Sequence, residues 1–203
     1  MSEVFLFRGC DKAYYGDVTE MVADDGSVTL TFGTPKKLFA VKEVGKTTSS
    51  DSATQYGDNK ALLIINSEGA DEISLSGFGL PADVLADITG KYFDESKGMF
   101  VNRPREFAYK YLLWREKLTT GKYRYCMAYK GTFNVPDGTT ATEDDGTDGN
   151  GQELTFTSIF TEKEFGDGQP SKGYFIDTTY VKDPEGFFTT AQDQDTITIT
   201  PLA

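Results

Sequence analysis

An acidic segment at residues 143–153, EDDGTDGNGQE, holds the residue types that could bind a metal ion. Carboxylate oxygens in a glycine-containing loop are the ligands that calcium prefers, and an EF-hand loop needs D-x-[DN]-x-[DN]-G followed by Glu at position twelve. A frame that starts at Asp144 places Gly146 at position three and Thr155 at position twelve, so two required ligands are missing. The frame that starts at Asp145 fails as well. The sequence therefore contains no EF-hand.

We interpret the region around this segment, at about residues 137–152, as an exposed acidic loop that connects two strands and keeps the surface soluble. An irregular calcium site at Asp144, Asp145 and Asp148 is the alternative. The matching function would then be a calcium-dependent, carbohydrate-binding β-sandwich. Metal binding at these three residues, together with an exposed aromatic platform, would distinguish that function from others.

The residue types needed for catalysis are either missing or placed without a pattern. The chain has no histidine, which excludes Ser-His-Asp and Cys-His arrangements and removes the commonest general base. Neighbouring carboxylates such as Asp94 and Glu95 arise by chance in a chain with 32 acidic residues. The turn GFGLP at residues 77–81 lacks the glycine spacing and the Lys-Ser/Thr of a phosphate-binding loop. The sequence predicts no enzyme, no metal and no cofactor.

The composition is that of an acidic globular protein. The formal net charge of −12 argues against nucleic-acid binding, because phosphate contacts need clustered lysine and arginine. Cys10 and Cys126 lie far apart in a chain without a recognisable secretory signal, so free thiols in a cytoplasm are expected. No apolar stretch reaches the roughly 20 residues of a membrane span, and no membrane partner is predicted.

Short β-strands dominate the elements that must position these residues. Apolar residues alternate with polar ones, the period of a half-buried strand, at residues 27–32, 38–44, 72–78, 105–116, 121–133, 153–161, 172–178 and 195–200. The continuous apolar run KALLIIN at residues 60–66 is interpreted as a strand buried on both faces. In the two segments at 105–116 and 121–133, the aromatic residues mostly share one parity and the basic residues the other. This pattern predicts strands with one buried and one solvated face.

One helix is predicted at residues 81–89, PADVLADIT. Pro81 suits the first helical turn, and Gly90 is a natural C-terminal stop. Val84 and Ile88 contribute to an apolar stripe that would pack against the strands. The helix is therefore expected to flank a predominantly β fold.

A long loop is predicted at about residues 45–57, GKTTSSDSATQYG, because this stretch is rich in Ser and Thr and has no apolar period. The fold class expected from all these elements is mainly β. It is a β-sandwich or partly closed barrel with one flanking α-helix, formed as a single domain over residues 1–203.

The order of these segments resembles a known family. The segments that carry the resemblance are RGCDKAYYGDVTE, LTFGTPKKLFAVKEV, ATQYGDNKALL, ISLSGFGLPADVLADITGKYFDESKGMFV, and the block from RPREFAYKYLLWREKLTTGKYRYCMAYKGTF to ELTFTSIFT. No single motif is specific, but their order and spacing together resemble the major tail proteins of long-tailed phages of Gram-positive bacteria, the phi13-type tail tube proteins.

The resemblance implies a structural virion protein. Six subunits would form a ring, and rings would stack into a tail tube through which viral DNA passes without specific binding. The implied partners are other copies of this chain, a tape-measure protein, and tail initiator and terminator proteins. The C-terminal immunoglobulin-like domain that some relatives carry is not expected here. A distal or terminator ring protein of the same fold is an alternative.

The long polar loop is the segment expected to contact the adjacent ring. Its length, its polar composition and the stacking loops of related tubes support this expectation. The residues are Lys46, Thr47, Thr48, Ser49, Ser50, Asp51 and Ser52.

Overall fold

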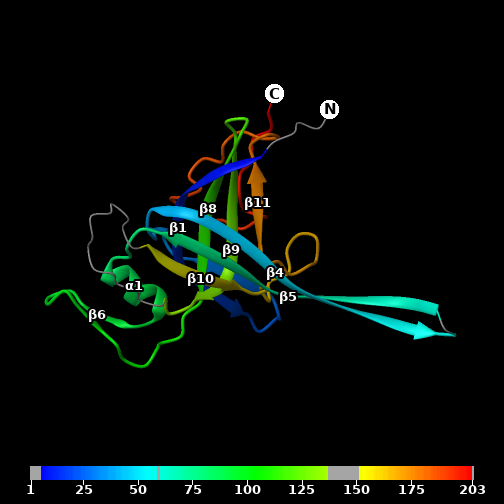
Figure 1. Ribbon diagram of the computed structural model, residues 1–203, viewed down its shortest axis with the longest axis horizontal. Coiled ribbons are helices and arrows are strands. Elements are labelled where there is room, and N and C mark those ends of the chain that lie inside the picture. The colour runs from blue at the N-terminus through cyan, green and yellow to red at the C-terminus, as the bar shows by residue number, and fades with distance from the viewer. Residues whose placement is uncertain (1–5, 59, 137–150, 203) are drawn as a thin grey trace, which may run out of the picture.

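The computed structural model describes residues 6–58, 60–136 and 151–202. The described residues form one short helix and a set of antiparallel strands (Figure 1). In chain order the elements are β1 (Phe7–Val22), β2 (Val28–Phe32), β3 (Lys36–Lys37), β4 (Val41–Gly57), β5 (Lys60–Gly77), α1 (Ala82–Thr89), β6 (Tyr92–Asp94), β7 (Met99–Val101), β8 (Lys110–Leu118), β9 (Tyr123–Phe133), β10 (Gln152–Ser158) and β11 (Gly173–Asp177).

One large sheet has the strand order β2-β1-β8-β9-β10-β5-β4, with β3 paired to β1 and β11 paired to β9. Strand β9 is the centre of this arrangement. One edge of β9 pairs with β8, and its other edge pairs first with β11 and then, near its C-terminal end, with β10. Strands β10 and β11 therefore follow one another along the same edge of β9.

The sheet curls so that β10, β5 and β4 pack over β1 and β8. Between the two halves lies a core that includes Tyr15 of β1, Trp114 of β8, Leu75 of β5 and Phe156 of β10. Within the described residues β4 and β1 are in contact but form no ladder, so the barrel does not close. The mainly β fold, with a sandwich-like sheet and one flanking helix, is confirmed.

A second core lies on the opposite face of β8 and β9. Tyr111 and Leu113 of β8 and Tyr125 and Tyr129 of β9 pack there against the segment that follows β11, including Phe187. The prediction that these two strands have one solvated face is wrong. Strand parity alone cannot show that a later segment of the chain covers the second face.

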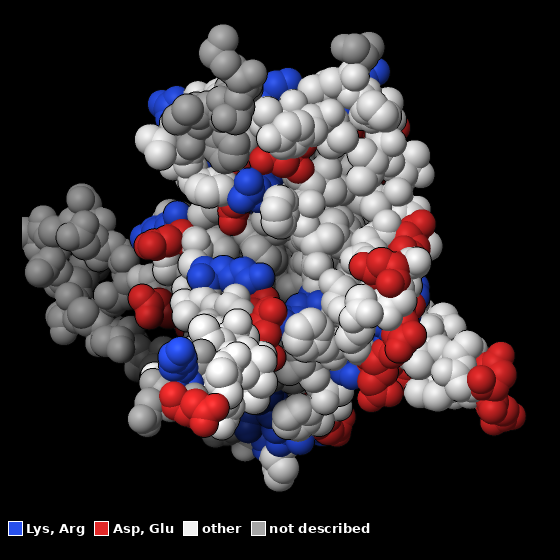
Figure 2. All heavy atoms as spheres, turned by 90° about the vertical axis from the view of Figure 1, so that its right-hand side faces the viewer, with Lys and Arg blue, Asp and Glu red and all other residues white. Residues whose placement is uncertain are grey.

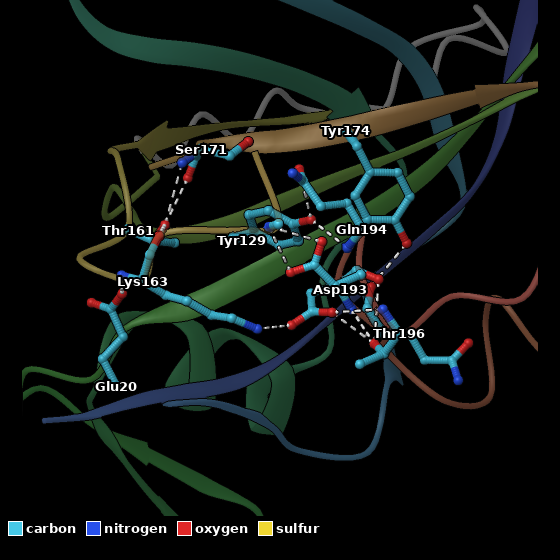
Figure 3. Close-up of polar contacts among 12 residues, drawn as sticks. Glu20, Tyr129, Thr161, Lys163, Ser171, Tyr174, Asp193, Gln194 and Thr196 are labelled. Atoms are coloured by element: carbon cyan, nitrogen blue, oxygen red, sulfur yellow. Dashed lines mark hydrogen bonds and ion pairs between the residues drawn. The ribbon is translucent and has the colours of Figure 1, made fainter. Parts of the chain in front are cut away.

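Polar contacts hold that later segment in place (Figure 3). Asp193 accepts hydrogen bonds from the Lys163 ammonium and from the backbone N–H of Thr196. The backbone N–H of Gln194 donates to the hydroxyl of Tyr129, 2.8 Å away, and Tyr174 donates from the sheet to a backbone carbonyl of the same segment. The strand predicted at residues 195–200 is absent, and the segment is instead an irregular cover of the second core.

The helix prediction is confirmed. Helix α1 follows Pro81 and ends at Gly90, whose φ of 66° places it in the left-handed region that glycine adopts without strain. Asp87 joins the helix to the sheet, because its carboxylate accepts hydrogen bonds from Lys110 Nζ (2.5 Å), Lys36 Nζ (2.6 Å) and the Tyr15 hydroxyl (3.1 Å). Lys110 is buried, and its charge is balanced by the carboxylates of Asp87 and of Asp17, each 2.5 Å from Nζ.

The predicted loop at residues 45–57 is wrong. These residues belong to β4, which pairs with β5 from Val41 to Gly57 and forms a long hairpin that projects from the body (Figure 1). The partner strand at residues 60–65 has a high β propensity, and backbone hydrogen bonds pair it with the Ser/Thr-rich strand whatever the apolar period of the latter. The expectation that residues 60–66 are buried is also wrong, since Leu62, Leu63, Ile64 and Ile65 are exposed.

The acidic loop expected at about 137–152 lies outside the described residues, except for its last two, and Gln152 is the first residue of β10. Asp144, Asp145 and Asp148 all lie outside the described residues.

We expect the substitution Asp87→Ala to lower the free energy of unfolding by about 1–3 kcal/mol, because it removes a partner of the buried Lys110 ammonium. The matched control is Asp83→Ala, which removes an exposed carboxylate from the same helix and should change the stability by only about 0.5 kcal/mol. Chemical denaturation measures both. Equal effects of the two substitutions would contradict the role assigned to Asp87.

The same contact predicts a pH dependence. Burial opposes the charged form of Asp87, but the hydrogen bonds from Lys110 and Lys36 outweigh it and lower the pKa of this carboxyl below its ordinary value of 3.8. A lowered pKa stabilises the fold fully above the ordinary pKa, and this stabilisation is lost as the pH falls through the lowered value. Denaturation of the native protein and of Asp87→Asn should therefore differ at pH 7 and converge as the pH falls below about 4. A constant difference down to pH 2 would contradict this.

Candidate functional site

The most distinctive surface is the outer part of the β4–β5 hairpin, which we call the arm: residues 48–58 and 60–70. Strand β10 pairs with β5 only from Asp71 to Gly77, so beyond Asp71 the two strands of the hairpin are paired only with each other in the described part of the chain. Figure 1 shows the arm extending well beyond the sandwich. At about 3.3 Å per residue, the ten-residue span from Thr48 to Asp58 is about 33 Å long.

The outer end of the arm is apolar and exposed. The exposed fractions of Tyr56, Leu62, Leu63, Ile64 and Ile65 lie between 51% and 75%. Successive residues of a strand point to opposite faces, so both faces of the arm are apolar near its tip. Burying four aliphatic side chains that are now rather more than half exposed would contribute about 5 kcal/mol. Exposed apolar surface of this kind marks a site of protein–protein contact.

The edges of the arm are also available. In the described residues β4 pairs on one edge only, with β5, and β5 has no partner beyond Asp71 on the edge opposite β4. A row of unpaired N–H and C=O groups is a template for a strand of another chain, and natural proteins cover or charge such edges unless they are used.

Charged residues fix the root of the arm to the body. The ammonium of Lys172, just before β11, contacts Asp71 at 2.8 Å and Glu68 at 2.5 Å, and Lys46 of β4 contacts Asp71 at 2.7 Å. Asp71 and Lys172 are only 4% and 8% exposed. Burial opposes the charge on Asp71, but the two lysines outweigh it and lower the pKa of this carboxyl. The same contacts raise the pKa of Lys172 against the effect of its burial.

A cavity of about 520 Å³ opens beside this root, and we call it the wedge. Asp71 and Ile73 of β5 line one wall, and residues 171–175 line the other. Trp114, Cys126 and Ala128, which belong to the first core, form its inner surface. The wedge therefore extends from the surface to the edge of the first core, whose residues there remain buried.

The outer face of the β10-β5-β4 half has a different character. The register places three residues of each strand on this face: Glu43, Gly45 and Thr47 of β4; Glu72, Ser74 and Ser76 of β5; Glu153, Thr155 and Thr157 of β10. Their neighbours Ile73, Leu75, Leu154 and Phe156 point to the core. The nine outward residues include three glutamates and no basic or large apolar side chain. We call this surface the acidic face.

Figure 2 views the molecule from the side to which the arm projects, and acidic side chains gather on the right of that view. Three lysines, Lys110, Lys130 and Lys172, are buried in ion pairs with carboxylates. The other lysine and arginine residues are exposed or partly exposed, but acidic residues outnumber basic ones by 12 in the whole chain.

The structure separates the residues predicted to contact the next ring. Lys46 and Thr47 lie at the root of the arm, where Lys46 is bound to Asp71. Thr48, Ser49, Ser50, Asp51 and Ser52 follow along its inner half, all exposed. The exposed apolar residues at the outer end of the arm, Tyr56, Leu62, Leu63, Ile64 and Ile65, are not among the predicted contact residues. The apolar run at residues 62–65 is the sequence signal for this surface, but the run by itself predicts a buried strand.

Other kinds of site find no support in the described residues. No group of three Cys, Asp or Glu side chains there could hold a metal ion, and the calcium alternative concerns residues outside this part of the chain. The single helix there has eight residues, and no described helix is long and apolar enough to cross a membrane.

A β-sandwich that presents an apolar arm with unpaired strand edges is a protein built to associate with other protein chains. The family described as phage tail tube protein matches residues 47–202, and the chain belongs to this family. The match includes the whole arm. No curated protein matches the chain. The protein is accordingly a structural component of the phage tail tube and hence of the virion.

Burial along β5 gives a prediction with an internal control. Ile64 and Ile73 lie in the same strand, but Ile64 is exposed on the arm and Ile73 is buried in the core. The substitution Ile64→Ala should change the free energy of unfolding by at most about 0.5 kcal/mol, whereas Ile73→Ala should lower it by about 2–5 kcal/mol. Urea denaturation of dilute, unassembled protein measures both. A large loss from Ile64→Ala would show that the arm packs onto its own body.

Proposed function

We propose that this protein is the major tail protein of a long-tailed phage. Six copies close into a ring, rings stack into a tube, and viral DNA leaves the virion through the tube. The observation that carries the proposal is the arm, whose apolar tip and strand edges have no partner in the described part of the chain. Together with the family match, it favours self-association as the role of this surface.

The arm projects from one side of the body, so it can contact a different surface of another copy, and such a contact can repeat along an assembly. A contact between two different surfaces of the same chain is heterologous, and it repeats from copy to copy until it closes a ring or extends into a filament. In this proposal Thr47, Thr48, Ser49, Ser50, Asp51 and Ser52 belong to the surface that meets the adjacent ring. The apolar tip supplies most of the stabilisation.

The acidic face suits the wall of a DNA conduit. A wall that bears Glu43, Glu72 and Glu153 among small hydroxyl side chains repels the phosphate backbone and offers no base stacking or lysine contact. DNA can then slide without binding. The overall net charge of −12 has the same sign.

The remaining partners follow from the same role. A tape-measure protein would occupy the tube during assembly, and initiator and terminator proteins would begin and end its growth. Assembly would take place in the host cytoplasm, and the finished tube would be part of the virion.

Electron microscopy of the purified protein tests the proposal. The native protein should form tubes with a central channel wide enough to admit duplex DNA. A variant in which Asn-Gly replaces residues 51–67 joins Ser50 to Glu68, which are paired in the native hairpin. It should fold and stay monomeric, since the removed residues make no core contact.

Two outcomes would overturn parts of this proposal. Normal tubes from the shortened variant would remove the arm from assembly. Closed single rings of the native protein at every concentration and salt would favour a distal or terminator ring protein of the same fold. The control for folding is the thermal unfolding midpoint of the shortened variant, which should match that of the native protein.

The acidic face predicts an electrostatic effect. Tubes of the double variant Glu72→Lys/Glu153→Lys should bind short duplex DNA, with an affinity that falls steeply as salt rises, whereas native tubes should not. The matched control is the double variant Asp183→Lys/Glu185→Lys, which makes the same change of charge at two exposed sites in the segment that follows β11. Co-sedimentation of labelled DNA with tubes measures binding. Equal binding by the control tubes would contradict the assignment of the acidic face to the channel.

A further inference from the structure

The wedge exists because of a mismatch in the sheet. Strands β10 and β11 lie one after the other along the same edge of β9, and β5 lies beside β10. Strand β5 pairs with β10 as far as Asp71, and then leaves the body with β4 as the arm instead of continuing beside β11. The outer edge of β11 and the outer edge of β5 are therefore separated by a gap, and neither has a strand partner there in the described residues.

Apolar side chains lie at the inner surface and at the rim of the gap, beside the charged side chains of Lys46, Glu68, Asp71, Glu116, Arg124 and Lys172. The inner surface is formed by Trp114, Cys126 and Ala128 of the first core. The rim carries Phe160 and Phe175, whose exposed fractions are 41% and 61%. The volume of about 520 Å³ is in the range of pockets that enclose a ligand rather than a single water molecule.

The charges at the gap are satisfied without an incoming group. Lys46 and Lys172 face Asp71 and Glu68, so the root of the arm contributes two positive and two negative groups that are already in contact. An apolar segment can enter beside them without leaving a buried charge unpaired. A charged ligand would find no unpaired counter-ion in this cluster.

The outer end of the arm combines exposed aliphatic side chains with strand edges that have no partner in the described part of the chain. The arm extends away from the body (Figure 1), and the wedge lies at the root of the arm, so the tip can fill a wedge only in another copy. Adding an extended segment to an exposed sheet edge is a common mode of recognition, in which main-chain hydrogen bonds give affinity and pockets receive alternate side chains.

We propose that the apolar tip of the arm, residues 54–58 and 60–65, inserts into the wedge of a second copy and pairs with the outer edge of its β11. The inference rests on the proposed self-assembly and names the surface that receives the arm. Because the wedge lies at the root of the arm and the tip lies about 33 Å from that root, successive wedges joined in this way lie about 33 Å apart. The contact is heterologous and repeats without limit, as the growth of a tube requires.

Disulfide trapping tests the pairing. In a background of Cys10→Ser and Cys126→Ala, a cysteine replaces Phe175 in the wedge, and a second cysteine replaces Leu62, Leu63, Ile64 or Ile65 in turn. Mild oxidation of assembled protein should give a ladder of covalent multimers on a denaturing gel without reductant. Because alternate residues of a strand share a face, one parity of the four positions should give at least about tenfold more ladder than the other.

The control moves the acceptor cysteine and keeps the arm positions. Phe107 is 73% exposed and does not line the wedge, so Phe107→Cys in place of Phe175→Cys should give no ladder. A ladder from the Phe107 pairs, or equal yields at all four arm positions with Phe175→Cys, would overturn the proposal.

Microscopy of the same samples separates this inference from the proposed function. Tubes that form without the Phe175 ladder overturn the wedge contact and leave tube formation intact. Failure of the native protein to form tubes or rings under any condition overturns both.

Hydrogen exchange of the unmodified protein covers the case in which Phe175→Cys itself prevents assembly. The backbone amides of β11 should exchange at least about tenfold more slowly in tubes than in dilute protein, because the added strand occupies its outer edge. Unchanged exchange in β11 on assembly would overturn the proposal.

Discussion

The pairing of β4 with β5 is the interaction on which the rest of the structure depends. Strand β5 is part of the sandwich from Asp71 to Gly77, where its inward side chains complete the first core and its edge pairs with β10. From Lys60 to Ala70 the same strand has only β4 beside it. A two-stranded ribbon is only marginally stable by itself, so the arm depends on the sandwich and on the ion pairs around Asp71 to hold its root.

The divergence of β5 from the body creates two features at once. It produces the arm, and it leaves the gap between β5 and β11, whose inner surface is formed by residues of the first core. A protein that remained a monomer would gain stability by closing that gap and by placing charged residues along the arm. The exposed aliphatic residues and the gap between β5 and β11 are consistent with a chain whose packing is completed by other copies of the protein, as expected of a member of the tail tube family.

Charged residues have two roles in this structure: buried ion pairs hold its parts together, and glutamates lie on one outer face. The buried lysines Lys110, Lys130 and Lys172 are each held by a carboxylate, and these ion pairs join the helix, the end of β1 and the root of the arm to the rest of the fold. The outer face of β10, β5 and β4 keeps glutamates among small hydroxyl side chains. A surface of this composition can face a polyanion without binding it.

The sequence by itself determined the β-rich class, the position of α1 between Pro81 and Gly90, most of the strands and, through the order of its segments, the family. These follow from local rules: the period of two in half-buried strands, the fixed φ of proline and the left-handed conformation of glycine. The acidic character and the lack of histidine also needed no structure. Local rules did not suffice where one segment covers another.

Tertiary structure alone decided which apolar residues are buried. Leu62 to Ile65 read like a core strand and are exposed, whereas both faces of β8 and β9 are buried because residues after β11 lie over them. The Ser/Thr-rich stretch at residues 45–57 reads like a loop and is a strand, because its partner supplies the backbone hydrogen bonds. The alternation of apolar and polar residues shows which face of a strand is buried only when the other face is exposed to solvent in the monomer. In this chain the cover of the second face and the wedge are defined by segments far apart in sequence, and that information is not local.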